Sequence, residues 1–185
     1  AGVFMLVRIS PLLQFSEIGS ITIISLGLLT ALISAFAAIN QDDIKKVLAY
    51  STISQLGFMF IAIGAGAYVA AIFHLVTHAF FKALLFLGAG AVIHEMHHEQ
   101  NIYKMGGLRK KMPVTAAMMG IGTLAISGIP PLAGFWSKDE ILASVFARGG
   151  IYYGFWALSL LAALMTAFYM GCLLYTSDAA DERRC

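Results

Sequence analysis

The chain has 185 residues, of which 59% are hydrophobic and 12% are charged, with a net charge of +2 at pH 7. A soluble domain carries about 25% charged residues, so this chain has about half the charge that a globule needs to cover its surface. The composition excludes a soluble domain, a disordered chain and a protein that binds nucleic acid. The two cysteines, Cys172 and Cys185, give neither a disulfide framework nor a metal-binding pattern. The sequence therefore predicts an all-α, polytopic membrane protein.

Six apolar segments account for most of the chain. A membrane-spanning helix needs about 20 mostly apolar residues, and lipid requires its backbone groups to be paired within the helix. We expect a transmembrane domain over residues 1–174 with one discontinuous helix. Its expected spans are 1–8, 21–39, 45–63, 69–94, 113–147 and 151–174. The first segment lacks an initiator methionine, and we expect it to be the last turns of a helix that begins outside the sequence.

The connections between these segments carry the charge. Residues 40–46 begin with Asn40 and place Asp42 and Asp43 in the expected first turn of a helix, where the helix dipole favours negative charge. If the spans alternate, the connections 40–46 and 95–112 lie on the same side. The basic residues of that side are Lys45, Lys46, Lys104, Arg109, Lys110 and Lys111. The other side has only Arg8 and Arg148, so the positive-inside rule predicts that the two connections are cytoplasmic.

The last residues differ from the rest. From Thr176 the sequence is polar and has no helical or strand period. The stretch from Leu174 to Cys185 resembles a translated sequencing adaptor, and we expect residues 175–185 to be a tail foreign to the protein. A short solvated tail is the alternative.

Ionisable side chains inside the segment 69–94 are the first candidate site. His74, His78 and Lys82 are spaced four residues apart, so they lie on one stripe of a helix. Lys82 is about 17–20 Å from either end of its segment at about 1.5 Å per residue, which is too far for its amine to extend to water. Burial disfavours the charged ammonium, so such a lysine can load and release a proton near neutral pH. Histidines titrate in the same range and can pass the proton on. The stripe predicts a proton pathway; interhelical hydrogen bonding is the structural alternative.

A second candidate lies where the segment 113–147 is interrupted. Gly128, Pro130 and Pro131 cannot continue a helix, and discontinuous helices mark ion sites in transporters. In this interpretation Lys138 lies near the break, with Asp139 beside it as a possible partner. The alternative is that the helix ends near Trp136 and that both charges lie at the membrane surface.

Two other polar groups are ambiguous. The segment 45–63 carries a polar face that can hold helices together or line a water path, made of Ser51, Thr52, Ser54 and Gln55. Lys45, at the start of the same segment, is either part of that lining or an anchor at the membrane surface. Histidines and glutamates between residues 94 and 99 resemble a metal cluster, but the connection is unconstrained and we predict a solvated loop. We predict no metal site.

Several long phrases resemble one family. Asp43–Gly57 and His74–Leu87 are similar to signatures of the antiporter-like, proton-translocating membrane subunits of respiratory complex I, NADH–quinone oxidoreductase. His97–Gln100, Lys104–Arg109 and Ala133–Glu140 match the same family in the same order. Lys138 followed by Asp139 favours the subunit L (chain 5) branch over its sister subunit M.

The resemblance implies a fold and a function. The family packs two inverted five-helix repeats, each with a broken helix and a lysine-centred half-channel, and this chain looks like the second repeat. Lys82 matches the central lysine, His74 and His78 the histidines that link it along the membrane, and Lys138 the lysine that connects to the outer side, with Asp139 beside it. The sequence departs from the family at Gly171 and Cys172.

The resemblance also implies the partners and the setting. They are other membrane subunits of complex I, the lipid bilayer, protons and internal water, with no nucleic acid, in a bacterial inner membrane. NADH, FMN, iron–sulfur clusters and quinone belong to other subunits, and this chain holds no cofactor and performs no redox chemistry. A subunit of a multisubunit sodium–proton antiporter and a purely structural helix bundle are the alternative functions.

Overall fold

The computed structural model describes residues 1–13 and 15–178, and within them it contains helices and turns but no strands. The expected all-α class is confirmed. Four helices are long and apolar enough to cross a membrane, namely α3 (Glu17–Ile39), α4 (Ile44–Gly64), α5 (Tyr68–Glu95) and α9 (Tyr152–Asp178). Two 15-residue helices, α7 (Pro113–Ser127) and α8 (Ala133–Ala147), lie between α5 and α9 in the sequence. The short elements are α1 (Gly2–Arg8), α2 (Ser10–Leu13), the 3-10 helix Ile102–Lys104 and α6 (Leu108–Lys111). The residues 179–185 of the expected tail lie outside the described part.

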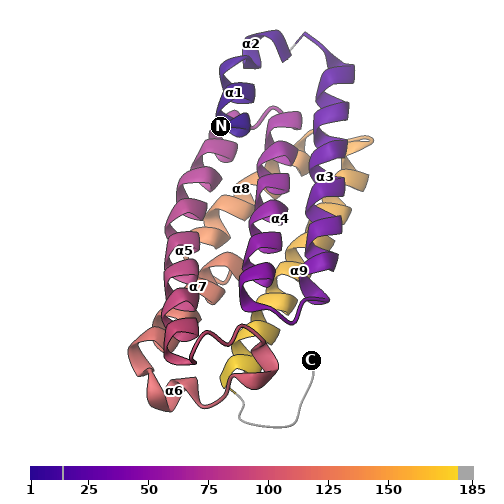
Figure 1. The fold of residues 1–185 in the computed structure, drawn as a ribbon. Coiled ribbons are helices and arrows are strands. Elements are labelled where there is room, and N and C mark those ends of the chain that lie inside the picture. The colour runs from indigo at the N-terminus through magenta and orange to yellow at the C-terminus, as the bar shows by residue number, and fades with distance from the viewer. Residues whose placement is uncertain (14, 179–185) are drawn as a thin grey trace.

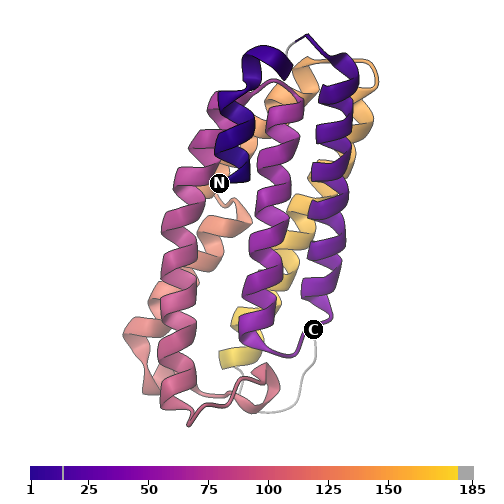
Figure 2. The same ribbon diagram turned by 45° about the horizontal axis from the view of Figure 1, so that its top comes forward.

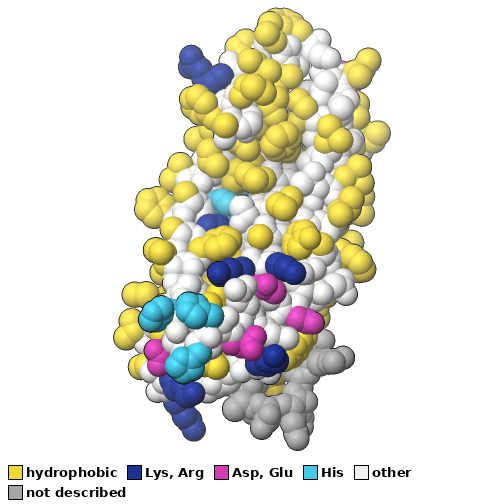
Figure 3. Space-filling model, in the orientation of Figure 1, with side chains coloured by type: hydrophobic (Ala, Val, Ile, Leu, Met, Phe, Trp, Pro, Cys, Tyr) yellow, Lys and Arg dark blue, Asp and Glu magenta, His cyan; other side chains and the backbone are white. Residues whose placement is uncertain are grey.

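The helices form two layers. Figures 1 and 2 show α3, α4 and α5 side by side, with α7, α8 and α9 behind them. Helix α4 is the most enclosed of the four long helices, with 67% of its apolar 18-residue stretch buried inside the bundle. The outer faces of α3, α5 and α9 expose large apolar side chains such as Phe36, Phe80 and Phe168. Figure 3 shows this apolar surface covering the flank of the bundle, which is what a lipid environment requires.

Small residues bring α3 and α4 into close contact. A Cβ atom at Gly57 would lie 2.6 Å from the backbone oxygen of Gly27, and one at Gly64 would lie 2.6 Å from Ile24. Backbones approach this closely only where side chains are absent, as at many helix contacts in membranes. The close packing fixes the register of α4, and therefore the positions of its polar side chains.

The break between α7 and α8 spans residues 128–132. Gly128 has a φ of +80°, the left-handed conformation in which glycine ends helices. Its N–H and that of Ile129 donate to Ala125 and Leu124, which closes α7. Helix α8 then packs against the end of α7, where Gly134 contacts the Ala125 carbonyl. The break thus places α8 beside the open carbonyl end of α7.

The charged connections meet at one end of the bundle, where Figure 3 shows most of the charged side chains. The N–H of Ile44 donates to Gln100 (3.1 Å) and that of Ile102 to Asp42 (2.8 Å), so the α3–α4 connection is paired with the loop after α5. Asp43 caps α4 by accepting from the Lys45 N–H at 2.8 Å. The two aspartates therefore precede the first turn of α4 rather than lying inside it, because the side chain of Asp43 replaces the missing helical partner.

Glu99 organises the loop after α5. Its carboxylate accepts from the backbone N–H groups of Asn101 (3.0 Å) and Gln100 (3.1 Å), and Lys104 lies 3.4 Å away. The hydrogen bond from Asn101, followed by that from Gln100 and the charge of Lys104, lowers the pKa of Glu99 below its usual value of 4.5. A lowered pKa means that the stabilisation is complete above about pH 4.5 and disappears as the pH falls through the lowered value.

We expect Glu99→Gln to loosen this loop at neutral pH, because a neutral amide accepts hydrogen bonds more weakly than a carboxylate. Hydrogen exchange measured by mass spectrometry on the full-length subunit should show faster exchange at Gln100 and Asn101. The exposed neighbour Glu95, changed to Gln, is the control and should leave exchange unaltered. Equal protection in wild type and Glu99→Gln would contradict the assigned role.

Candidate functional site

Lys82 lies near the middle of the 28-residue α5 and is 6% exposed. Its amine donates to the Leu48 carbonyl at 2.9 Å and to the Ser51 hydroxyl, both on α4. The Phe86 ring lies 5.6 Å from the amine. Lys82 therefore faces α4 inside the bundle and has no carboxylate partner among the described residues. A cation held only by neutral oxygens can lose its proton without leaving a buried counter-charge.

His74 connects three helices. Its Nδ1 lies 2.9 Å from the Ser137 hydroxyl on α8, and its Nε2 lies 3.2 Å from Gln55 Oε1 on α4. Because an amide oxygen only accepts, this arrangement assigns the hydrogen of a neutral His74 to Nε2 and leaves Nδ1 to accept from Ser137. The Thr77 hydroxyl lies 3.2 Å from that of Ser137 and extends the network. The acceptor nitrogen of His74, Nδ1, therefore lies beside Ser137, the residue directly before Lys138 in the sequence.

His78 lies between the other two members of the stripe. Its ring centroid is 6.3 Å from that of His74, and its edge packs against Phe81. The side chain is 7% exposed, and its Nε2 has no hydrogen-bond partner in the described structure. Buried polar atoms without partners are rare, and this nitrogen is open to a further hydrogen bond. The structure thus buries all three residues of the stripe on the inner face of α5.

Lys138 is 4% exposed on α8, just after the break. Its amine donates to the Ile126 carbonyl at 2.6 Å and lies 5.4 Å from the centre of the Phe58 ring. Ile126 is in the last turn of α7, where carbonyl groups lack helical partners and attract cations. Asp139, the next residue, is exposed, and no ion pair between the two is found in the described part of the chain. The helix break supplies the partner of Lys138 in place of Asp139.

The polar side chains of α4 fall into two groups according to what they contact. Ser51 contacts Lys82, and Gln55 contacts His74 and also donates to the Thr166 hydroxyl on α9 at 3.4 Å. Ser54 instead donates to Ala31 on α3 at 3.1 Å, and Thr52 donates back to Leu48 at 3.0 Å. Lys45 is exposed at the start of α4. Ser51 and Gln55 therefore contact the ionisable side chains, whereas Ser54 and Thr52 bond to backbone carbonyls.

Polar side chains follow one another across the bundle in a polar line, in the order Lys82, Ser51, Gln55, His74 and Ser137. Hydrogen bonds join each neighbouring pair except Ser51 and Gln55, which lie about one turn apart on α4. Sequence reasoning did not single out Ser137, a member of this line, or the residues that approach it from α5 and α9, namely Thr77, Thr166 and Tyr169. The signals were a threonine directly before His78, a serine directly before Lys138, and a threonine and a tyrosine three residues apart in the uncharged segment 151–174. Such residues are common in membrane helices, and only the packing shows which of them face the line.

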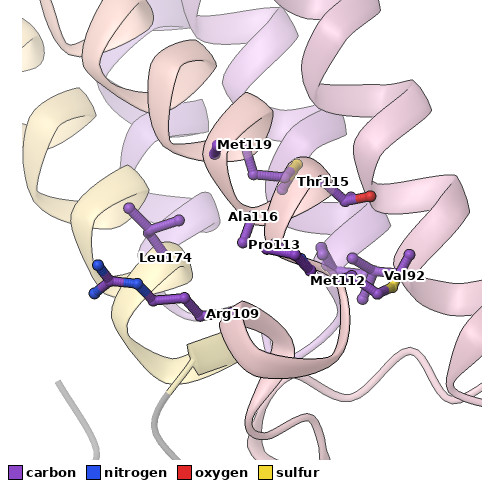
Figure 4. Close-up of a pocket in the computed structure, with 10 residues that line it drawn as sticks. Val92, Arg109, Met112, Pro113, Thr115, Ala116, Met119 and Leu174 are labelled. Carbon is purple, nitrogen blue, oxygen red and sulfur yellow. The ribbon is translucent and has the colours of Figure 1, made fainter.

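A cavity of about 430 Å³ lies at the charged end, apart from this line. Figure 4 shows it between α5, α7 and α9, with Arg109 at its edge and Met119 and Leu174 on its walls. Its lining is mostly apolar and includes none of the residues of the polar line. In the described residues no cluster of three or more histidines, cysteines or carboxylates is arranged to hold a metal.

Known proteins are similar to this chain over nearly all of its length. Residues 1–166 match the model of a family described as NADH:quinone oxidoreductase/Mrp antiporter, transmembrane. NADH-quinone oxidoreductase subunit L of Rhodobacter capsulatus is 48% identical over 194 aligned positions, which cover 99% of the chain and 27% of that protein. The same subunit of Rickettsia bellii is 54% identical over 169 positions, 91% of the chain and 26% of that protein. NAD(P)H-quinone oxidoreductase chain 5 of Synechocystis is 52% identical over 178 positions, 92% of the chain and 26% of that protein. The chain spans about a quarter of the length of these relatives.

Proposed function

Because the chain belongs to the NADH:quinone oxidoreductase/Mrp antiporter family of integral membrane proteins, we propose that it carries protons through the membrane arm of NADH–quinone oxidoreductase. The observation that supports this most strongly is the pair of buried lysines, Lys82 and Lys138, together with His74, whose ring contacts Gln55 on α4 and Ser137, the residue before Lys138. Ionisable groups at membrane depth cost about 2.5–3.5 kcal/mol on insertion scales. A purely structural bundle has no need of two such groups with neutral partners.

In the proposed mechanism protons move and electrons do not. Lys82 and Lys138 alternate between ammonium and amine, and His74 and His78 hand protons between them with the help of Ser137 and internal water. Each lysine keeps neutral oxygen partners in both states. NADH oxidation and quinone reduction take place in other subunits, and their conformational or electrostatic effects shift the lysines between loading and release. Asp139, which is exposed beside Lys138, is proposed to be part of the proton path where the path reaches the outer side of the membrane.

The proposed setting is a bacterial inner membrane with other complex I subunits as neighbours. Relatives from Rhodobacter and Rickettsia support this location. The connections 40–46 and 95–112, which hold most of the basic residues, are proposed to face the cytoplasm.

A sodium–proton antiporter subunit is the second candidate, because the matched family includes Mrp antiporters. This alternative predicts sodium-dependent exchange without NADH. The proposed function predicts proton transport that requires NADH and quinone and does not respond to sodium.

The proposal is tested by Lys138→Ala in the full-length subunit, in the assembled complex reconstituted into liposomes. We expect fewer protons to be moved per electron, with transfer along the interrupted path slowed by about a hundredfold or more. The exposed Lys111, changed to Ala, is the control and should pump normally. Unchanged pumping in Lys138→Ala would return Lys138 to a structural role at the helix break.

A further inference from the structure

Tyr169 is a buried tyrosine on α9 that the proposed path does not yet use. The side chain is 2% exposed, and no group among the described residues meets the full geometry of a hydrogen bond with its hydroxyl. The hydroxyl lies among four polar side chains, those of Ser51, Ser54, Gln55 and Thr166. Leaving a hydroxyl unpaired in an apolar interior is unfavourable. The Tyr169 hydroxyl therefore lowers its free energy by turning toward one of these neighbours.

Two of these four neighbours contact the ionisable groups of the site. Ser51 accepts from the Lys82 amine, and Gln55 Oε1 lies 3.2 Å from His74 Nε2. The remaining two, Ser54 and Thr166, donate their hydrogens to backbone carbonyls. Tyr169 is therefore beside both a partner of Lys82 and a partner of His74. The alternative connection, along α5, passes His78, whose Nε2 has no hydrogen-bond partner among the residues that the structure describes.

We propose that Tyr169 is a positioning residue whose hydroxyl couples the charge of Lys82 to the hydrogen bonding of His74; this rests on the proposed function. A phenol has one hydrogen to donate and also accepts. The field of a charged Lys82 turns this hydrogen away from Ser51 and toward Gln55 Oε1. When Lys82 is neutral, the hydrogen turns back to the Ser51 oxygen. Gln55 thereby gains or loses a second donor as Lys82 changes charge.

This coupling acts on His74 through one atom. Gln55 Oε1 is the acceptor for the Nε2 hydrogen of His74, so a competing donor from Tyr169 changes how firmly that hydrogen is held. No covalent bond is made or broken, and Tyr169 keeps its proton throughout. The rotation of one hydroxyl is enough to transmit the state of α5 at Lys82 back to the same helix at His74, through α4 and α9.

The test is Tyr169→Phe in the full-length subunit of the assembled complex, with the pH profile of NADH-driven proton pumping in liposomes as the readout. The hydrogen bond that the proposal assigns to this hydroxyl changes an equilibrium about fivefold, which corresponds to about 0.7 pH unit. We expect the alkaline limb of the profile to move to lower pH by about this amount, because the hydroxyl oxygen no longer favours a charged Lys82. His78 and Lys138 are the other titratable groups within electrostatic reach of Lys82 and His74, and both remain in every variant.

The matched control is Tyr152→Phe, which removes a buried hydroxyl of α9 that accepts from Arg148 outside the polar line. It should leave the profile unchanged. In a Gln55→Leu background, Tyr169→Phe should cause no further shift, because without the Gln55 acceptor the hydroxyl no longer turns its oxygen toward Lys82. If Tyr169→Phe does not assemble, a difluorotyrosine at position 169, which keeps the size and strengthens the donor, should still displace the profile.

A wild-type profile in Tyr169→Phe, or in the difluorotyrosine variant, overturns the coupling. An equal additional shift in the Gln55→Leu background overturns the route through Gln55. Failure of the proposed function is distinguished by Lys138→Ala: if that variant pumps normally, the pathway itself is wrong, whereas loss there with no effect at Tyr169 rejects only the coupling.

Discussion

Replacing Lys82 by Met in the full-length subunit is expected to lower the number of protons moved per electron and to slow turnover. Methionine keeps an unbranched side chain of similar length, so the packing against Leu48 and Ser51 is largely retained while the ionisable group is lost. Lys82→Arg is expected to fail in the same way for the opposite reason. A guanidinium stays charged under all conditions in a protein, so it can hold a proton but cannot release one.

Comparing Lys82→Met with Lys82→Arg distinguishes a loss of proton transfer from a loss of stability. Replacing a buried charge by an apolar side chain is often neutral or stabilising, so Lys82→Met should assemble normally. Proton movement is measured in liposomes alongside NADH oxidation, with Lys46→Met, the same change at an exposed lysine of α4, as the control. Full pumping by Lys82→Met would show that the bundle does not conduct through this lysine, and full pumping by Lys82→Arg would show that Lys82 need not release its proton.

Gly134→Ala is expected to disrupt the contact between α7 and α8. A Cβ atom at this position would lie 1.8 Å from the backbone oxygen of Ala125. No rotamer change relieves an overlap with backbone, so the two half-helices must move apart. Overpacking costs about 1–3 kcal/mol and occasionally more, and this clash should reach or exceed the upper value. The amine of Lys138 would also lose its position at Ile126, one residue after Ala125.

The measurement is the thermal unfolding and the yield of the assembled subunit in detergent. Gly120→Ala, on α7 with nothing within 4 Å of the added Cβ, is the matched control. It should be neutral or slightly stabilising, since alanine favours helix by about 1 kcal/mol over glycine. An unfolding temperature for Gly134→Ala equal to that of wild type would mean that α7 and α8 are not packed as described.

Local patterns in the sequence predicted the helices and one face of the site. The four-residue spacing of His74, His78 and Lys82 indicated a common stripe, because a helix repeats every 3.6 residues. Gly128, Pro130 and Pro131 indicated an interruption, because glycine and proline have distinctive backbone conformations. These inferences need only the chain within about one turn of the residues concerned.

Contacts between helices could not be predicted in the same way. Ser51 and Thr52 are adjacent in sequence, yet only Ser51 reaches Lys82, because the register of α4 is set by its small-residue contact with α3. Lys138 and Asp139 suggested a pair, but successive side chains on a helix point about 100° apart. One therefore faces the end of α7 and the other is exposed.

The carbonyl end of α7 differs from a carboxylate as a partner for Lys138. A carboxylate can itself pick up the proton that its lysine releases, and it then becomes neutral. Backbone oxygens cannot do so, and the attraction that they exert is permanent. The amine at Ile126 is thus held by a fixed dipole whose strength depends only on geometry. A displacement of α8 relative to α7 would change this attraction, because it would change the distance between the Lys138 amine and the Ile126 carbonyl.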